Sequence, residues 1–269
     1  MRVARLVLSV SISFLLSVSL AAQEAATSSP QALALLQKSL ATLTGGQSIT
    51  DITLSGTARR IAGSDDESGT GTLSAISVGS SKVVLSFPSG PRTEIRVFSN
   101  NCPLTGSWSG PDGVHHPVSN HNLLIDPSWF FPAFTIGRLV TPGTYVLSYV
   151  DHETWNGRAV EHVSAYRPSD FQPPAGIPTP SHLTQIDLLL DSSTLLPVAL
   201  MFNTHPDNDM GLDIPVRIAF SDYRTVNGFQ VPFRVQKFLN NTLTLDLQFQ
   251  SATLNSGLTS AAFTVGAGL

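Results

Sequence analysis

A stretch near the middle of the 269-residue sequence carries three histidines, His115, His116 and His121, shortly after Asp112. Imidazole nitrogens and carboxylate oxygens are the ligands that bind zinc or copper in proteins. The glycines and Pro117 around them favour a loop, and the spacing aligns no set of ligands. We therefore interpret the stretch as a polar loop that carries histidines, and we predict no metal site in the chain.

A second stretch rich in oxygen ligands covers residues 207–213, where Asp207, Asp209 and Asp213 lie close together. Carboxylates at this density suit calcium, but an EF-hand loop requires glycine at its sixth position and glutamate at its twelfth. The stretch does not fit that spacing. An acidic hairpin loop is therefore the better interpretation.

The sequence contains no arrangement typical of catalysis. Residues 106–110 are similar to the G-x-S-x-G motif of hydrolases, but Trp108 stands where the serine would be. No glycine-rich phosphate loop precedes a helix, and Cys102 is the only cysteine, so no thiol pair exists. We predict no catalytic residues, no cofactor and a protein that is not an enzyme.

The strongest functional candidate is an apolar segment made of Trp129, Phe130, Phe131, Phe134 and Ile136. Aromatic side chains supply a large apolar contact area, so this segment could line or cover a cavity that binds an apolar ligand. In the alternative interpretation, the same side chains plug the open end of a barrel as ordinary core. The sequence leaves both interpretations open.

The elements that must position this segment are mainly β-strands. Polar and apolar residues alternate along residues 229–237 and 242–250, which is the period of a strand with one face in an apolar interior. Asn240 and Asn241 between them predict a tight hairpin turn. In the second strand the predicted interior residues are Leu243, Leu245, Leu247 and Phe249, while Thr244 and Asp246 are predicted to point outward.

The remaining sequence predicts one helix, further strands and a loop-rich middle. Ser29 and Pro30 suit the start of a helix, and Gly45 and Gly46 its end. Strands are predicted at 49–61, 70–78, 81–87, 92–98, 144–151 and 159–166, with turns at 63–69 and 156–157. Residues 100–134 are predicted as loops, with a short helix near 125–140, and the proline-rich residues 167–181 as an irregular loop.

The first 22 residues predict export. Arg2 and Arg5 precede an apolar stretch over residues 6–20, and Ala21 and Ala22 follow it, which is the order typical of a secretory signal peptide. The stretch is short and serine-rich for a bilayer span. We therefore predict a signal peptide at 1–22, a single domain at 23–269 and no permanent membrane anchor. The mature protein is expected in the periplasm or outside the cell.

The charge composition excludes several classes of partner. Lysine and arginine number 15 against 19 aspartates and glutamates, and charged residues make up 13% of the chain. Typical proteins contain about 25% charged residues. Because no basic run is present to neutralise phosphates, we predict no nucleic-acid partner and no electrostatic docking on anionic lipid head groups. The oligomeric state stays open.

The last third of the chain carries the residues of a family resemblance. Residues 187–191 read DLLLD and residues 194–197 read TLLP, while residues 222–232 have the form D-Y-x-x-x-x-G-x-x-x-P. Leu254, Asn255 and Phe263 follow. With the opening helix, this order resembles the LolA-like superfamily of exported bacterial proteins, from about Pro30 to Val265. Residues 100–121 and 167–181 look like additions to that pattern.

The resemblance implies a mainly β (α+β) fold, in which a strongly curved antiparallel sheet forms an incomplete barrel with helices packed in its concave side. It also implies an apolar cavity that binds acyl chains, lipids or lipoproteins in the bacterial cell envelope. We predict a non-enzymatic binding protein of this kind. The alternative is an envelope protein-interaction domain whose barrel is filled by its own side chains and binds no ligand.

Overall fold

The computed structural model describes residues 27–99, 102–125, 128–169, 174 and 176–265. The predicted signal peptide at residues 1–22 lies outside this set. Among the described helices, none combines the length and the apolar character that crossing a bilayer requires.

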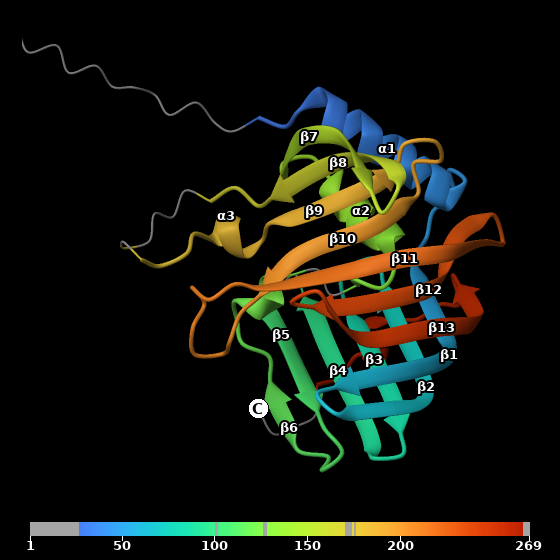
Figure 1. Cartoon of the computed structure of the whole chain (residues 1–269), viewed down its shortest axis with the longest axis vertical. Coiled ribbons are helices and arrows are strands. Elements are labelled where there is room, and N and C mark those ends of the chain that lie inside the picture. Colours follow the sequence, from blue (N-terminus) through green and yellow to red (C-terminus); the bar gives the residue numbers. More distant parts are fainter. Residues whose placement is uncertain (1–26, 100–101, 126–127, 170–173, 175, 266–269) are drawn as a thin grey trace, which may run out of the picture.

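The described residues form one antiparallel sheet of 13 strands in the order β6-β5-β4-β3-β2-β1-β13-β12-β11-β10-β9-β8-β7. The first and last strands of the chain's sheet, β1 and β13, pair at its centre, and β6 and β7 form its two edges (Figure 1). The strands are β1 Asp51–Ala62, β2 Asp65–Ile76, β3 Ser81–Phe87, β4 Gly90–Ser99, β5 Cys102–Ser109, β6 His115–Pro117, β7 Val146–Trp155, β8 Arg158–Tyr166, β9 Ile186–Asp191, β10 Pro197–Thr204, β11 Ile214–Val226, β12 Phe229–Leu239 and β13 Thr242–Leu254.

Two helices pack on the concave side of this sheet. In Figure 1, α2 (Pro132–Leu139) lies behind β9 and β10, and α1 (Pro30–Thr44) runs along the end of the sheet near β7. Their apolar residues join the concave faces of the strands in one core cluster. Three short helical turns complete the described structure, α3 at Pro180–Leu183, η1 at Asn122–Leu124 and η2 at Ser260–Ala262. The prediction of an incomplete barrel with helices in its concavity is confirmed.

The first helix has the ends that the sequence predicts. The side chain of Ser29 accepts a hydrogen bond from the backbone N–H of Ala32 at 3.3 Å, and Pro30 occupies the first turn. Gly45 ends the helix in the left-handed region, at φ 59°. Leu36 and Leu43 point from the apolar stripe into the core.

The hairpin between β12 and β13 confirms the alternating pattern, with one exception. Both Asn240 and Asn241 have positive φ, as a tight turn between twisted strands requires. Leu245, Leu247 and Phe249 are buried, as predicted, whereas Leu243 is only half-buried. The pairing with β12 shifts by one residue just before Leu245, and this β-bulge interrupts the alternation.

The turn predicted over residues 63–69 is wrong, because only Gly63 and Ser64 separate β1 from β2. Residues 65–69 continue the ladder, where Arg60 pairs with Glu67 across the strands at 3.3 Å. Gly69 is part of the reason that a loop was predicted here. This strand position requires glycine, because a Cβ atom on residue 69 would lie 1.9 Å from the carbonyl oxygen of Ser86.

The loops predicted over residues 100–134 are wrong in part, because β5 and β6 extend the sheet there. Gly106, which suggested a loop, lies opposite Arg96 in the ladder with β4. A Cβ atom on Gly106 would lie 2.8 Å from the Leu123 side chain, so glycine allows η1 to pack on this strand. The short helix predicted near 125–140 is confirmed as α2, although it is shorter.

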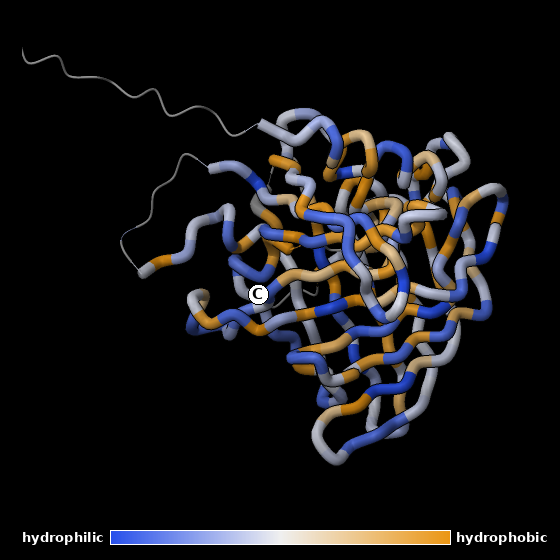
Figure 2. Tube along the Cα trace, turned by 45° about the horizontal axis from the view of Figure 1, so that its top comes forward, coloured by the Kyte–Doolittle hydropathy of each residue, from blue (hydrophilic) through white to orange (hydrophobic). Residues whose placement is uncertain are grey.

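The apolar residues follow the curvature of the sheet. Figure 2 shows hydrophobic and hydrophilic positions alternating along many strands, as expected for a sheet with one face toward a core.

The hairpin predicted at Asn156 and Gly157 is confirmed between β7 and β8, with both residues at positive φ. The residues predicted as an irregular proline-rich loop, 167–181, end in α3, which also contains His182.

A buried carboxylate fastens the end of β13 to the start of β1. Asp51 accepts hydrogen bonds from the backbone N–H of Ser256 at 2.8 Å and of Gly257 at 3.0 Å. The Ser256 hydroxyl donates a third at 2.6 Å and the Thr50 hydroxyl a fourth at 3.0 Å. Burial alone would raise the pKa of Asp51, but these hydrogen bonds outweigh it and lower the pKa.

Replacing Asp51 with alanine should reduce the free energy of unfolding by about 3 kcal/mol at pH 7, because buried donors left unsatisfied cost about 1–3 kcal/mol each. Since the pKa of Asp51 is lower in the folded state, its contribution is complete above the ordinary aspartate pKa. It is lost as the pH falls through the folded pKa. Urea titrations at neutral and acid pH measure both effects. Asp65→Ala, at an exposed position, is the matched control and should change little; an equal loss in both variants would contradict this assignment.

Candidate ligand-binding site

A cavity of about 490 Å³ opens where the first and second halves of the sheet face each other. Its walls come from strands on both sides of the central β1–β13 pair and from the aromatic segment that precedes α2. The lining residues include Val83, Leu85, Trp108, Trp129 and Leu245, together with the charged Arg60, Arg92, Glu94 and Lys237.

The deep wall of the cavity is apolar. Val83 and Leu85 lie two residues apart on β3, so both point to the concave face, and Leu245 on β13 lies across from them. Trp129 closes the wall and packs edge to face on Phe130, with ring centroids 5.6 Å apart. These four lining side chains are largely buried, so an apolar ligand would meet a preformed surface.

The rim of the cavity carries paired charges. Glu67 lies 3.3 Å from Arg60 and 3.5 Å from Arg92, and it also accepts a hydrogen bond from the backbone N–H of Ser89. The guanidinium of Arg92 lies over the ring of Phe87, 5.4 Å from its centroid. One carboxylate is therefore shared by two arginines, which leaves this side of the rim with excess positive charge.

Lys237 brings a further cation to the opposite side of the rim. Its amino group lies over the ring of Trp129, 5.2 Å from the centroid. Burial lowers the pKa of Lys237, and the nearby carboxylate of Glu94 offsets only part of that effect. Burial would raise the pKa of Glu94, but the positive charges of Arg96 and Lys237 outweigh it and lower the pKa.

The charge balance of the rim favours an anionic group. Arg96 holds Glu94 through an ion pair at 2.7 Å and donates a second hydrogen bond to the backbone oxygen of Asn122. Of the charged residues that line the cavity, three are cationic, Arg60, Arg92 and Lys237, and one, Glu94, is a carboxylate. An apolar wall beside a positive rim can bind an amphiphile whose head group carries negative charge.

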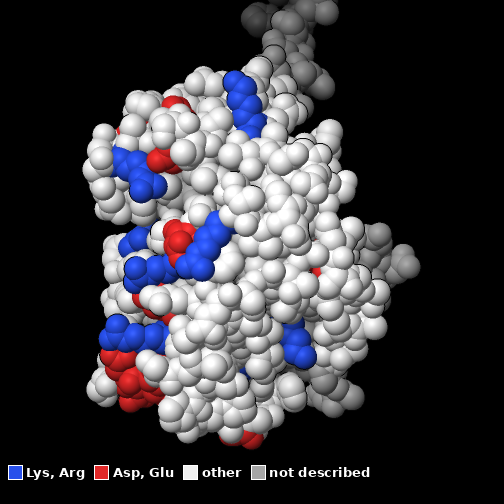
Figure 3. Space-filling model, turned by 90° about the vertical axis from the view of Figure 1, so that its right-hand side faces the viewer, with Lys and Arg blue, Asp and Glu red and all other residues white. Residues whose placement is uncertain are grey.

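On the outer face of the sheet, charges are balanced locally instead. Basic and acidic side chains pair at Arg59–Asp66, Arg224–Asp222 and Arg234–Asp246, with distances of 2.5, 2.6 and 2.8 Å. Figure 3 shows side chains of both signs gathered in a band along the left edge of that view, while most of the remaining face is uncharged. The excess positive charge at the cavity rim is therefore not a property of the whole surface.

The structure separates the five aromatic and aliphatic residues that the sequence singles out. Trp129 lines the cavity. Phe134 lines a second cavity of about 360 Å³ between α1 and α2. Phe130, Phe131 and Ile136 are fully buried in the main core cluster. That all five contact a bound ligand stays a prediction.

Sequence reasoning did not identify the residues that surround Trp129. Val83 and Leu85 were placed only in a predicted strand, Leu245 was predicted to face the interior, and Lys237 was assigned to neither face of its strand. Alternation within each strand is visible in the sequence, but the juxtaposition of β3 with β12 and β13 is not. Lys237 lies two residues after the buried Val235 and opposite Leu245, so the alternation of β12 places it on the concave face.

The histidine stretch does not converge on one point. His115 and His116 belong to β6, where the ring of His116 stacks on Trp108 with centroids 4.4 Å apart. His121 is buried, and its Nε2 atom lies 3.2 Å from the Ser119 hydroxyl and 3.1 Å from the backbone oxygen of Pro206. Asp112 accepts a hydrogen bond from the backbone N–H two residues later. The side chains of Asp112, His116 and His121 therefore each have a local structural partner.

No protein-family model matches the sequence, and no curated protein matches it. Solved structures do match its fold. A domain named for outer membrane lipoprotein sorting, from Vibrio parahaemolyticus, superposes with a TM-score of 0.56 at 12% identity, covering 87% of this chain and 96% of that one. A LolA superfamily protein from Nitrosomonas europaea gives 0.50 at 14% identity, with coverage of 87% and 97%. A DUF1329 family protein from Desulfovibrio piger gives 0.51 at 9% identity, with the same coverage. The chain therefore has the LolA-like fold.

Proposed function

We propose that this protein is a non-enzymatic binding protein of the bacterial cell envelope that takes up an acyl chain, as part of a lipid or a lipoprotein, with an anionic group at the cavity rim. The observation that carries the proposal is the 490 Å³ cavity, whose wall is apolar and whose rim holds Lys237, Arg60 and Arg92. Ligand pockets commonly measure about 300–1,000 Å³ and combine apolar walls with a few polar groups.

The fold supports the same class of ligand, since one of the solved structures that share it is named for outer membrane lipoprotein sorting. A fold alone does not determine function, so the geometry of the cavity carries the greater weight. Export through a signal peptide at residues 1–22, and a mature single domain at 23–269, belong to this proposal. Amino-terminal sequencing of the protein from its native host tests them, and retention of Met1 would contradict export.

The second candidate is an interaction domain that binds no ligand. The observation in its favour is the complete burial of Phe130, Phe131 and Ile136, which shows that the chain's own side chains fill much of the concavity. Native mass spectrometry followed by lipid extraction separates the two. Co-purified lipid supports the first candidate, and a protein without lipid that also binds no acyl probe supports the second.

Filling the cavity should weaken the binding of a fluorescent fatty acid. Val83→Trp places a large ring on the apolar wall, and we expect the affinity to fall by about tenfold or more, which corresponds to a loss of about 1.4 kcal/mol. Val150→Trp, on an exposed position of β7, is the matched control and should bind normally. Unchanged binding by the Val83 variant, once circular dichroism shows that it is folded, would contradict this site.

The rim should distinguish a fatty acid from the corresponding fatty alcohol. Lys237→Gln should reduce the preference for the acid by about tenfold or more, because hydrogen bonds to charged groups contribute about 1.5–3 kcal/mol. Lys237 loses its positive charge as the pH rises. Because burial lowers the pKa of Lys237, its contribution to the preference should be lost at a lower pH than the ordinary lysine pKa would give. Lys82→Gln, on the adjacent position to Val83, is the control. An undiminished preference in the Lys237 variant would show that the head group does not lie beside Lys237.

A further inference from the structure

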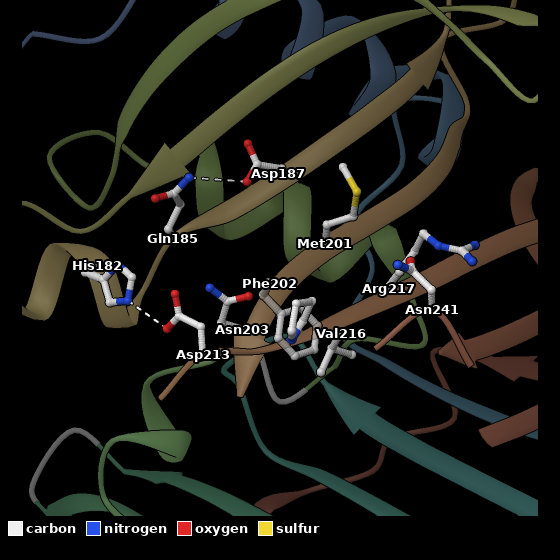
Figure 4. Close-up of a pocket in the computed structure, with 11 residues that line it drawn as sticks. His182, Gln185, Asp187, Met201, Phe202, Asn203, Asp213, Val216, Arg217 and Asn241 are labelled. Atoms are coloured by element: carbon white, nitrogen blue, oxygen red, sulfur yellow. Dashed lines mark hydrogen bonds and ion pairs between the residues drawn. The ribbon is translucent and has the colours of Figure 1, made fainter. Parts of the chain in front are cut away.

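A cluster of potential metal ligands lies at the base of the loop between β10 and β11. Asp213 is its centre, because one carboxylate oxygen lies 2.9 Å from Nε2 of His182 and 3.0 Å from Nε2 of His205. Figure 4 shows His182 and Asp213 turned toward each other at one end of a pocket. This cluster is separate from the apolar cavity and shares no lining residue with it.

Two independent elements bring the three side chains together. The antiparallel register of β10 and β11 ends with Thr204 opposite Ile214, so His205 and Asp213 face each other one step beyond the last rung. His182 comes from α3, whose first turn is capped by the Thr179 hydroxyl, which accepts a hydrogen bond from the backbone N–H of His182. The cluster therefore joins the end of the proline-rich segment to the β10–β11 loop.

The distances suit a metal ion. One ligand atom from each residue lies within 4.8 Å of the others. Zinc binds imidazole nitrogen and carboxylate oxygen at about 2.0–2.2 Å in tetrahedral geometry, so neighbouring ligand atoms lie roughly 3.3 Å apart. The two separations to Asp213, 2.9 and 3.0 Å, are within a few tenths of an ångström of that value. A small movement of the half-exposed His182 and Asp213 would complete the geometry.

His205 is the most buried of the three side chains. Its side chain is 1% exposed, and its Nδ1 atom has no hydrogen-bond partner in the described part of the chain. A buried imidazole nitrogen without a partner is an unmet interaction. The other ring nitrogen, Nε2, lies 3.0 Å from the Asp213 carboxylate, and it is the atom that an ion beside Asp213 would bind.

We propose that His182, His205 and Asp213 form a binding site for a divalent transition-metal ion of the zinc class. Two histidines and one carboxylate leave a fourth position open on a tetrahedral ion. The pocket beside the cluster, of about 340 Å³, supplies space for water or an exogenous donor at that position, with Gln185 and Asn203 on its wall (Figure 4). The ion would clamp α3 to the β10–β11 loop.

The direct test is titration of the chelator-treated protein with Zn²⁺ by isothermal calorimetry near pH 7.5. The wild type should bind one equivalent saturably, and its unfolding temperature should rise with added Zn²⁺. His182→Ala and Asp213→Asn should each weaken binding by about tenfold or more and remove the thermal shift. Both side chains are 39% exposed, so these variants should fold normally, which circular dichroism verifies.

Two control variants distinguish this site from other cation-binding groups. His115→Ala removes an exposed histidine of β6. His162→Ala removes the histidine that lies between Glu153 and Asp187. Both controls should bind Zn²⁺ as the wild type does. The proposal is overturned if the wild type shows no saturable binding, if the His182 and Asp213 variants bind normally, or if either control variant loses the ion.

Discussion

Replacing Leu247 with aspartate is expected to destabilise the protein by more than about 4 kcal/mol, because the substitution places an unpaired charge in the core. Leu247 is 0% exposed. It lies opposite Ala58 of β1 and Val235 of β12, at the pair of strands on which both halves of the sheet depend. Urea unfolding followed by circular dichroism measures the loss, and a large part of the population should be unfolded without denaturant.

The neighbouring position provides the control for this prediction. Gln248 is exposed on the opposite face of the same strand, so Gln248→Asp introduces the same side chain into water. It should change the free energy of unfolding by less than about 0.5 kcal/mol. Similar losses in the two variants would contradict the assignment of faces along β13.

Replacing Phe130 with alanine is expected to cost about 3–5 kcal/mol, the range found when large aromatic side chains are deleted from cores. Phe130 is fully buried against the ring of Trp129 and the rest of the core cluster. If it only fills the core, the folded variant should still bind a fluorescent fatty acid with nearly unchanged affinity. Chemical denaturation and a binding titration on the same sample measure both quantities.

Trp129→Ala is the matched comparison within the same segment. Trp129 lines the cavity, and the amino group of Lys237 lies over its ring. Trp129→Ala should therefore weaken fatty-acid binding more than Phe130→Ala does. A Phe130 variant that keeps its stability but loses the ligand would instead support a lid made of the whole aromatic segment. Equal binding by both variants and the wild type would remove this segment from the ligand site.

The elements that the sequence predicted well are those whose signals are local. The cap at Ser29, the stop at Gly45 and the turn at Asn240 each act within a few residues, and the structure confirms all three. The failures occurred where a distant contact overrides a local preference. Gly69 and Gly106 suggested loops, but each is a strand position where another part of the chain approaches too closely for a side chain.

The candidate sites were harder to predict for the same reason. Trp129 was recognisable from its residue type, but its cavity depends on which strands face each other across the barrel. His205 and Asp213 are joined by hairpin register, which becomes visible only once the ends of β10 and β11 are known. His182 lies in α3, directly after the residues 167–181 that were predicted as an irregular loop, and no helical pattern in the sequence marked this short helix.

The pairing of β1 with β13 has a consequence for the order in which the molecule can assemble. Ile52 lies opposite Leu254, and Asp51 binds the residues that follow β13, so the centre of the sheet joins segments about 200 residues apart in the sequence. The hairpins β1–β2 and β11–β12 can form while the chain is being synthesised, but the two halves can join only after residue 254 has emerged. Pairings of such long sequence separation form slowly. Until then, the edges of β1 and β12 and the apolar concave faces lack their partners, a condition that favours aggregation.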